Sequence, residues 1–373
     1  MATRERILKI FNYEAPDRLP AVMFGFWTEL LEEWERSGFV GKGFTKVWGD
    51  GNEYDDEILY KLGADYNWQS FFFANSFLNP CFEHKVVERR ADGFVLQQNH
   101  MGVTEIVKPG ASGIPGEHDW LLKDRAGFEE HYKHRLEPGA SRVDLTHLQK
   151  RWDTRNKERP FGLFLGSLLG STRDMLTLTG MSYLIADDED LFIGICDTVG
   201  EICYTNAKTI LEYAAAHGIT FDCAHFWEDI CFKNGPLLSP DSFGRYCGKH
   251  YKRITGLCKS YGIKYISLDC DGVIGALIPI WFENGVNVMF PLEIGTWGDQ
   301  FEAARAKYGK GLYGVGSMDK TVLRRDKAAV DAEIKRIWRL VKLGGFIPCP
   351  DHRLMPGTKP ELVKYYFEKI KEM

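Results

Sequence analysis

From residue 160 onward, short apolar runs alternate with amphipathic stretches of ten or more residues, and this alternation constrains the fold more than any other feature. It is typical of strand–helix units that build a parallel sheet. The six runs are FGLFLGS (161–167), ITFDCAHFW (219–227), IKYISLDCD (263–271), VNVMFPLE (286–293), GLYGVGSMD (311–319) and GFIPCPD (345–351). Candidate strands at 18–26 and 65–73 bring the total to eight, which is the number that closes a barrel. We therefore predict an α/β fold, a (β/α)8 TIM barrel, with an open doubly wound sheet as the alternative.

The first 160 residues depart from this alternation. A short helix is predicted within the first twelve residues, and a β-hairpin between about 83 and 108, around the turn Ala91-Asp92-Gly93. The stretch 109–160 is rich in Gly, Pro and charge, with helical pieces near 123–135 and 143–155. We interpret 1–373 as a single barrel domain with N-terminal helical and β-hairpin excursions, in which 83–160 is peripheral.

Composition excludes several classes of partner. The chain has 47 basic and 52 acidic residues without a Lys/Arg-rich block, so nucleic acid is not an expected partner. The most apolar later run, 273–282, is half of the ~20 residues that cross a bilayer and contains Pro279, so we expect a core helix and no membrane span. No apolar core follows the early basic residues, and nine dispersed cysteines indicate reduced thiols, so a cytoplasmic protein is predicted.

Thiols and carboxylates stand where the predicted strands end, which is where barrel active sites lie. Cys270, Glu293 and Cys349 follow the fifth, sixth and eighth strands, and Cys231 lies just beyond the fourth. These residue types bind Zn²⁺, and they converge if the barrel closes. Buried packing as small apolar side chains is the alternative for each cysteine.

Other strand-end residues could act on a substrate. His225 and His352 are candidate acid–base groups or metal ligands, although a structural role, such as an ion-paired clip Asp351-His352-Arg353, is the alternative. Trp27, Trp68 and the run 71–73, with Phe72 at its centre, could line an apolar pocket for a ring-bearing substrate. Core packing is the alternative for these aromatic residues.

Five segments resemble the uroporphyrinogen decarboxylase superfamily, a barrel family that also includes corrinoid-dependent methyltransferases. They are TRERILKIFNYEAPDRLP (3–20), FKNGPLLSPDSF (232–243), ENGVNVMFPLE (283–293), GVGSMDK (314–320) and GGFIPCPDHRLMP (344–356). The resemblance covers nearly the whole chain. It is specific for the superfamily and much less specific for the reaction.

Two details separate the branches of this superfamily. Uroporphyrinogen decarboxylases carry an arginine-bearing motif after the first strand, whereas this chain has FGFWTE (24–29) and no basic residue until Arg36. The methyltransferase branch resembles cobalamin-independent methionine synthase in a zinc site of His-x-Cys, a Glu and a distant Cys. Cys270, Glu293 and Cys349 match three of these positions, while the histidine position falls on Leu268. Cys231, Asp271 or His225 could supply the fourth ligand.

The resemblance therefore implies the substrate-side methyltransferase of an O-demethylase system. Such an enzyme moves a methyl group from a methoxylated aromatic compound, or a similar donor, to the cobalt of a separate corrinoid protein. Zn²⁺ would act as a Lewis acid on the ether oxygen, which is otherwise a poor leaving group. A homodimer is one assembly compatible with this reading.

Two other classes of function remain open at this stage. A decarboxylase or lyase of the same superfamily, acting on a small acid, would use Asp271 and His225 as acid and base and would need no metal. A binding or scaffold protein would keep the barrel without chemistry. Metal analysis separates the first of these from the zinc methyltransferase.

Overall fold

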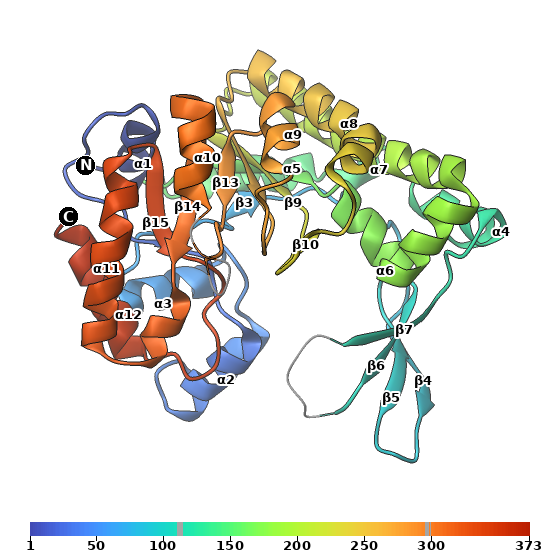
Figure 1. The fold of residues 1–373 in the computed structure, drawn as a ribbon, viewed down its shortest axis with the longest axis horizontal. Coiled ribbons are helices and arrows are strands. Elements are labelled where there is room, and N and C mark those ends of the chain that lie inside the picture. The colour runs from blue at the N-terminus through green and yellow to red at the C-terminus, as the bar shows by residue number, and fades with distance from the viewer. Residues whose placement is uncertain (110–114, 295–297, 299) are drawn as a thin grey trace.

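The computed structural model describes residues 1–109, 115–294, 298 and 300–373, and a parallel sheet of seven strands forms its centre (Figure 1). In spatial order the strands are β3 (Phe71–Phe72), β8 (Gly162–Gly166), β9 (Cys223–Trp227), β12 (Tyr265–Asp269), β13 (Val288–Phe290), β14 (Tyr313–Met318) and β15 (Phe346–Pro350). Each of the six predicted apolar runs contains one of them. Neighbours in the sheet follow chain order, as expected for successive strand–helix units.

Strands β1 (Val22–Met23) and β2 (Tyr66–Asn67) form a separate parallel pair. They are shorter than the strands predicted at 18–26 and 65–73, and the second of those predicted strands is divided into β2 and β3. An isolated parallel bridge between Phe26 and Leu354 connects the segment after β1 with the segment after β15. The described residues thus show an α/β fold with a parallel sheet, but no continuous hydrogen-bonded ring.

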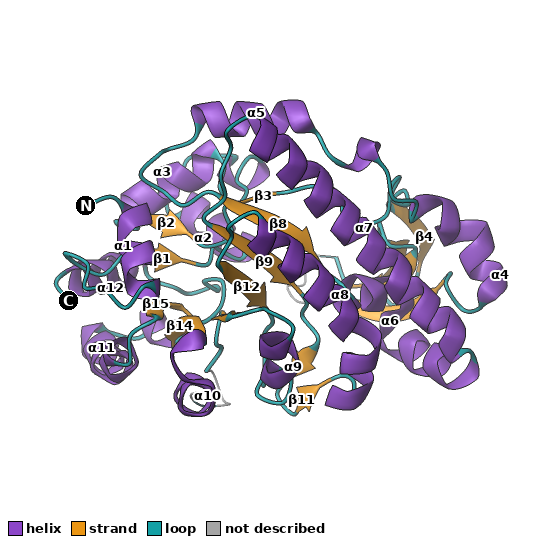
Figure 2. Ribbon diagram, turned by 90° about the horizontal axis from the view of Figure 1, so that it is seen from above, coloured by secondary structure: helices purple, strands orange, loops and turns teal. Residues whose placement is uncertain are grey.

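Helices surround the sheet, and α7 and α8 run along its outer side (Figure 2). They are α1 (Thr3–Phe11), α2 (Thr28–Arg36), α3 (Glu53–Leu62), α5 (Leu145–Thr154), α6 (Leu169–Asp187), α7 (Glu189–Ala216), α8 (Pro240–Ser260), α9 (Ile278–Glu283), α10 (Phe301–Tyr308), α11 (Lys327–Lys342) and α12 (Pro360–Lys371). The helix expected at 273–282 begins only at Ile278, with a proline in its first turn. Across the described ranges, no helix combines the length and the hydropathy that a membrane span requires.

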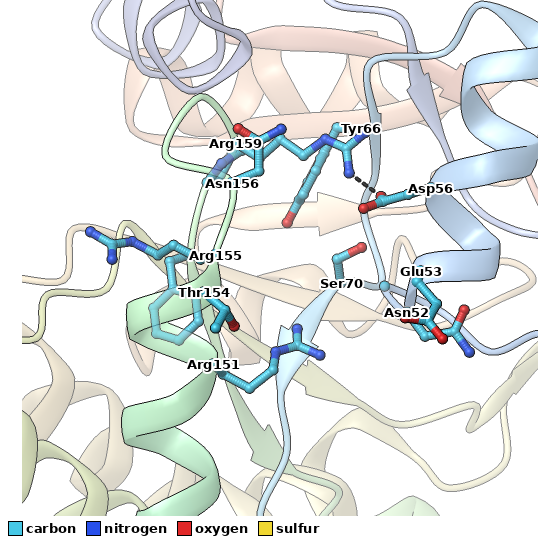
Figure 3. Close-up of a pocket in the computed structure, with 13 residues that line it drawn as sticks. Asn52, Glu53, Asp56, Tyr66, Ser70, Arg151, Thr154, Arg155, Asn156 and Arg159 are labelled. Carbon is cyan, nitrogen blue, oxygen red and sulfur yellow. Dashed lines mark hydrogen bonds and ion pairs between the residues drawn. The ribbon is translucent and has the colours of Figure 1, made fainter.

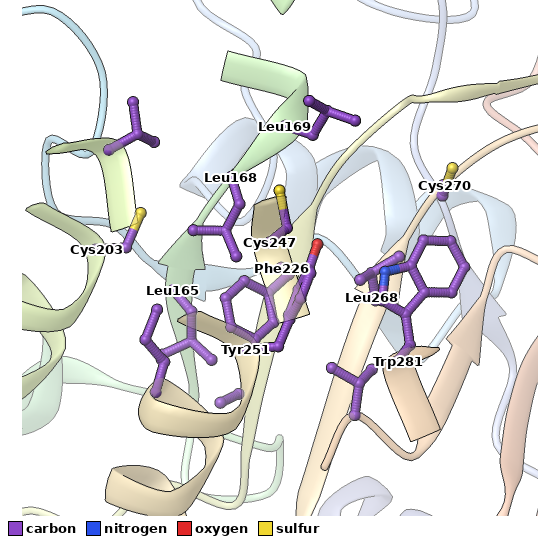
Figure 4. Packing of buried hydrophobic residues seen from close by; sticks show 14 of the residues in the cluster. Leu165, Leu168, Leu169, Cys203, Phe226, Cys247, Tyr251, Leu268, Cys270 and Trp281 are labelled. Atoms are coloured by element: carbon purple, nitrogen blue, oxygen red, sulfur yellow. The ribbon is translucent and has the colours of Figure 1, made fainter. Parts of the chain in front are cut away.

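An apolar layer between the sheet and the helices α7 and α8 fixes the strands (Figure 4). Leu165 of β8 and Phe226 of β9 belong to this layer, together with Tyr251 of α8 and Trp281 of α9. All four side chains are at most 2% exposed. Strands buried on both faces are rigid supports for the residues that follow them.

The predicted hairpin is the first half of a four-stranded antiparallel sheet, β4 (Lys85–Arg89), β5 (Val95–Gln98), β6 (Val103–Val107) and β7 (Gly116–Trp120). This sheet extends from one side of the molecule in Figure 1, as expected for a peripheral excursion. The helical piece expected near 123–135 is a short α4 (Arg125–Gly127) followed by irregular helical turns, and α5 is the second expected piece. A small hairpin of β10 (Cys231–Phe232) and β11 (Gly235–Pro236) follows β9.

Candidate active site

A cavity of about 330 Å³ opens where the strands of the parallel sheet end. We call it the strand-end cavity. Its aromatic walls are Phe24, Phe73, Phe77, Phe164 and Trp227, and its polar lining residues are Asp50, Gln69, Asp229, Asp269, Asp271, His352 and Arg353. Active sites of parallel barrels lie at this end of the strands, so this cavity is the candidate active site.

Asp269, the last residue of β12, is the most deeply buried acid of the cavity. Its side chain is 4% exposed, and Gln69 Nε2 donates a hydrogen bond of 2.6 Å to its Oδ2 atom. Burial raises the pKa of Asp269 well above its ordinary value, and repulsion from Asp271 raises this pKa further, although the Gln69 hydrogen bond acts in the opposite direction. The site therefore favours the protonated carboxylic acid at Asp269.

Asp271 and His352 form a pair beside Asp269. His352 Nε2 lies 3.0 Å from Asp271 Oδ2, and Trp27 Nε1 donates to His352 Nδ1 over 3.4 Å. Burial opposes a charge on His352, but the hydrogen bond and the negative charge of Asp271 outweigh burial, so the pKa of His352 is raised above its ordinary value. Asp271 Oδ1 is buried and has no hydrogen-bond partner among the described residues.

Arg353 and Asp50 neutralise each other at the cavity wall. Arg353 Nη2 lies 2.6 Å from Asp50 Oδ2. Gly25 permits this approach, because its φ is +104° and a Cβ there would stand 2.6 Å from Arg353 Nη1 and 2.8 Å from Asp50 Oδ1. With this arginine paired, the cavity keeps an excess of acidic groups.

Asp229 adds to that excess. It follows β9 with a left-handed backbone (φ 48°), and its carboxylate lies 3.6 Å from the Arg173 guanidinium. Burial raises the pKa of Asp229, Arg173 lowers it, and the negative charge of Asp271 raises it again. Three carboxyl groups, those of Asp229, Asp269 and Asp271, thus lie close enough to influence one another's protonation.

The structure does not bring the four predicted zinc ligands together. The thiols of Cys270 and Cys231 contact each other in the apolar layer, and the Ile230 N–H group donates to Cys270 Sγ over 3.4 Å. Cys349 belongs to a different apolar cluster, where its neighbours include Tyr366 of α12. Burial raises the pKa of Cys270 and of Cys349 well above the ordinary thiol value.

Glu293 has other partners. Its Oε2 atom accepts a hydrogen bond of 2.9 Å from the Gly272 N–H group, and its Oε1 atom lies 3.6 Å from Lys320 Nζ. Within the described part of the chain, no three His, Cys, Asp or Glu side chains are grouped as ligands of one metal ion. Alternation along β12 is the physical reason at Cys270: Asp269 and Asp271 face the cavity, so the residue between them points to the other side.

His225, predicted as a catalytic group, is fully buried and does not line the strand-end cavity. Its ring stacks on Phe71 with centroids 4.2 Å apart, and its Nδ1 atom lies 2.6 Å from Ser267 Oγ. Ser267 Oγ donates to the Ala224 carbonyl over 3.2 Å, so Nδ1 of the imidazole carries the hydrogen and Nε2 is left without a partner among the described residues. Burial lowers the pKa of His225 to about 3, which keeps the ring neutral.

The predicted substrate-binding aromatics divide into three environments. Trp68 is 2% exposed and packs in the core, with its ring 6.1 Å from Phe290. Phe72 is also 2% exposed and stacks on His147 of α5, outside the sheet. Trp27 contacts His352 without lining the cavity. Of the four predicted substrate-binding residues, His352 alone lies in the cavity wall.

Phe73, which belongs to the predicted run 71–73, does line the cavity, where it is 49% exposed and faces Phe164 across 4.5 Å between ring centroids. Sequence reasoning did not single out several other lining residues as part of a site. Gln69, Asp50 and Arg353 act through pairing with a partner distant in sequence, which no local pattern reveals. Asp269 does carry a local signal, because it stands two residues before Asp271 at the end of an apolar run.

Comparisons with known proteins place this arrangement in a family. The sequence matches the family described as Uroporphyrinogen decarboxylase (URO-D) over residues 160–373, more than half of the chain. A solved methyltransferase from Methanosarcina mazei has a similar fold, with a TM-score of 0.61 at 14% identity over 100% of this chain and 99% of that one. A second structure, described as a vitamin-B12 independent methionine synthase from Listeria monocytogenes, reaches a TM-score of 0.36 at 13% identity over 58% and 64% of the two chains. A comparison with curated protein sequences gives no significant match.

Proposed function

The chain belongs to the uroporphyrinogen decarboxylase family, and we propose that it is a methyltransferase that removes the methyl group of a small methoxylated aromatic compound. As the acceptor of the methyl group we propose the corrinoid of a separate partner protein, whose cobalt would supply the nucleophile. The observation that carries the proposal is the buried acid Asp269 at the wall of an aromatic cavity. The fold shared with a methyltransferase supports it.

We further infer that the strands close into a barrel with the strand-end cavity at its mouth. Two backbone hydrogen bonds support closure between the first and last strands: Trp27 N–H donates to the Leu354 carbonyl over 2.9 Å, and Leu354 N–H donates to the Gly25 carbonyl over 3.0 Å. A closed arrangement places Phe24 and His352 on the same rim, which agrees with the 5.5 Å between their ring centroids.

Leaving-group chemistry explains why a buried acid suits this reaction. When the methyl carbon is attacked, the C–O bond breaks and its electron pair stays on oxygen. An alkoxide or phenoxide is a poor leaving group, so proton transfer to that oxygen lowers the barrier. We assign this proton to Asp269, held on Oδ1 because Oδ2 accepts from Gln69. The predicted zinc ligands do not form one donor set, so no step is assigned to zinc.

The pair His352–Asp271 has two roles in this proposal. The negative charge of Asp271 keeps the proton on Asp269, since two neighbouring carboxylates disfavour double ionisation. The side chains of the pair are partly exposed, 21% for His352 and 28% for Asp271, so they can return a proton from solvent after each turnover. Trp27 orients the imidazole through the Nδ1 contact.

The acidic excess of the cavity favours a neutral ether over an anionic substrate. A carboxylate substrate would face Asp229 and Asp271, while Arg353 is already paired with Asp50. This is the physical argument against decarboxylation of a small acid, for which the same buried proton donor would otherwise serve.

The test is methyl transfer from a panel of methoxyarenes to Co(I) cobalamin, followed by the visible absorbance of the cobalamin. We expect Asp269→Asn to lower kcat by about 10²- to 10⁴-fold, because the amide keeps the shape of the acid but supplies no transferable proton. The exposed Asp241→Asn, at the start of α8, is the matched control and should keep the wild-type rate.

Two results would replace the proposal. Release of CO₂ from a carboxylic acid without corrinoid would establish the decarboxylase alternative. Stoichiometric zinc in the purified protein, lost together with activity in Cys270→Ala, would return the leaving-group role to a metal.

A further inference from the structure

A second cavity, of about 380 Å³, lies away from the strand ends, between the start of α3 and the segment that joins α5 to β8 (Figure 3). It shares no lining residue with the strand-end cavity. Arginines from one wall and hydroxyl groups from the other face it, and its lining includes Arg151, Arg159, Tyr66 and Ser70. We call it the arginine cavity.

Tyr66 supplies the strongest sign that this cavity is a binding site. Its side chain is 2% exposed, and its hydroxyl group has no hydrogen-bond partner among the described residues. In Figure 3 this hydroxyl points into the arginine cavity. A buried hydroxyl without a partner is unfavourable, so a ligand atom that accepts its hydrogen would be favoured there.

Arg151 supplies an available positive charge. Its half-buried side chain extends into the cavity in Figure 3, and no ion pair or hydrogen bond engages its guanidinium within the described ranges. The other two arginines are occupied, since Arg159 is paired with Asp56 and Arg155 stacks on the Trp152 ring. Tyr66, Arg151 and Arg159 line the same cavity. Burial raises the pKa of the Tyr66 phenol, as do its interactions with Cys223 and with Asp222, which is paired with Arg4, whereas the charges of Arg159 and Arg151 lower this pKa.

Opposing charge limits where a ligand can sit. Asp56 is used by Arg159, but Glu53 in the first turn of α3 also lines the cavity. An anionic group must therefore lie on the Arg151 and Tyr66 side, with Ser70 as a further hydroxyl within the lining. An uncharged part of the ligand can extend toward Glu53.

We propose that the arginine cavity binds a small molecule through one oxyanion group, a phosphate or a carboxylate. The planar guanidinium of Arg151 matches two oxygens of either group, and the Tyr66 hydroxyl donates to one of them. A phosphate has more acceptor oxygens than a carboxylate, so it can accept hydrogen bonds from more of the donors that line the cavity.

Binding itself is the appropriate measurement, because Ser70 is adjacent to Gln69 and activity would mix effects on both cavities. Isothermal titration calorimetry of the full chain with inorganic phosphate, and separately with acetate, at constant ionic strength gives each affinity directly. We expect saturable binding of at least one anion, weakened at least tenfold in Arg151→Gln and several-fold in Tyr66→Phe. Lys150→Gln, an exposed charge change on the preceding residue of α5, should bind like the wild type.

Tyr66→Phe keeps the ring and removes a hydroxyl without a partner, so its melting temperature should equal or exceed that of the wild type. Saturable binding of phosphate alone assigns the site to phosphate, and binding of both anions with similar affinity assigns it to carboxylates as well. The proposal is overturned if neither anion binds, or if Arg151→Gln binds with the affinity of the wild type.

Discussion

Replacing His225 should remove much of the acid sensitivity of this protein. The imidazole is fully buried, and burial lowers its pKa to about 3, whereas the unfolded chain has the ordinary value of about 6.5. Between these two values the unfolded state binds a proton that the folded state does not bind. Stability due to this residue is therefore complete above pH 6.5 and is lost progressively as the pH falls toward 3.

The magnitude follows from the two pKa values. Between pH 7 and pH 4.5, proton uptake by the unfolded His225 should lower the free energy of unfolding by about 2.5 kcal/mol. His225→Phe keeps a planar ring against Phe71 and leaves Ser267 its hydrogen bond to the Ala224 carbonyl. In that variant this contribution of about 2.5 kcal/mol should be missing from the pH dependence.

Urea unfolding at a series of pH values from 4.5 to 7 measures this difference. Other buried groups also titrate, but they are common to both proteins and cancel when the wild type and the variant are compared. His217→Gln, at an exposed position after α7, controls for the loss of an ordinary histidine and should leave the pH dependence of the wild type nearly unchanged. The reasoning is refuted if His225→Phe shows the same pH dependence as the wild type.

Three further predictions address the cavity and the backbone that supports it. Phe73→Ala should raise KM for an aromatic substrate with little change in stability, because Phe73 is 49% exposed at the cavity wall. Phe72→Ala should instead lower the free energy of unfolding by about 3–5 kcal/mol and leave KM unchanged. If both variants changed KM and urea unfolding equally, this division would be contradicted. Arg142→Lys should lower the free energy of unfolding in urea by about 3 kcal/mol, because the buried guanidinium donates to four backbone carbonyls and an ammonium group cannot reach all four. A loss below about 1 kcal/mol would contradict this role of Arg142. Gly316→Ala should fail to fold, as judged by circular dichroism, because its Cβ would stand 1.3 Å from the Pro291 carbonyl oxygen. Gly256 of α8 has open space around it, so the control variant Gly256→Ala should fold with equal or greater stability.

The fold was largely predictable because its signal repeats. Each buried strand from residue 161 onward is an apolar run followed by an amphipathic helix, and six such units leave few alternatives. The strands β1 and β2 have only two residues each, so their apolar patterns carried little information about length. The fourth strand of the excursion, β7, lies in the stretch 109–160, whose Gly, Pro and charged residues resemble a loop.

Individual site residues were less predictable, and the errors share one cause. In a parallel sheet covered by helices, both faces of a strand are apolar, so the sequence does not show which of two neighbouring residues faces inward. The predictions included Asp271 and the run 71–73, but they chose Cys270 as a ligand and Phe72 at the centre of that run, whereas the cavity is lined by Asp269, Asp271 and Phe73. A shift of one residue exchanges the two faces completely.

A physical criterion could have resolved the ambiguity at β12. A carboxyl group buried in an apolar layer without partners costs several kcal/mol, whereas a thiol packs there as a small apolar side chain. Where Asp, Cys and Asp follow one another at a strand end, the two acids should take the face with water and polar partners, and the cysteine should take the other. This assignment puts Asp269 and Asp271 in the cavity and Cys270 against Cys231, as the structure does. The same criterion gives no answer at 71–73, where three phenylalanines have equal claims to either face, so only the tertiary structure identifies Phe73 as the ring at the cavity wall.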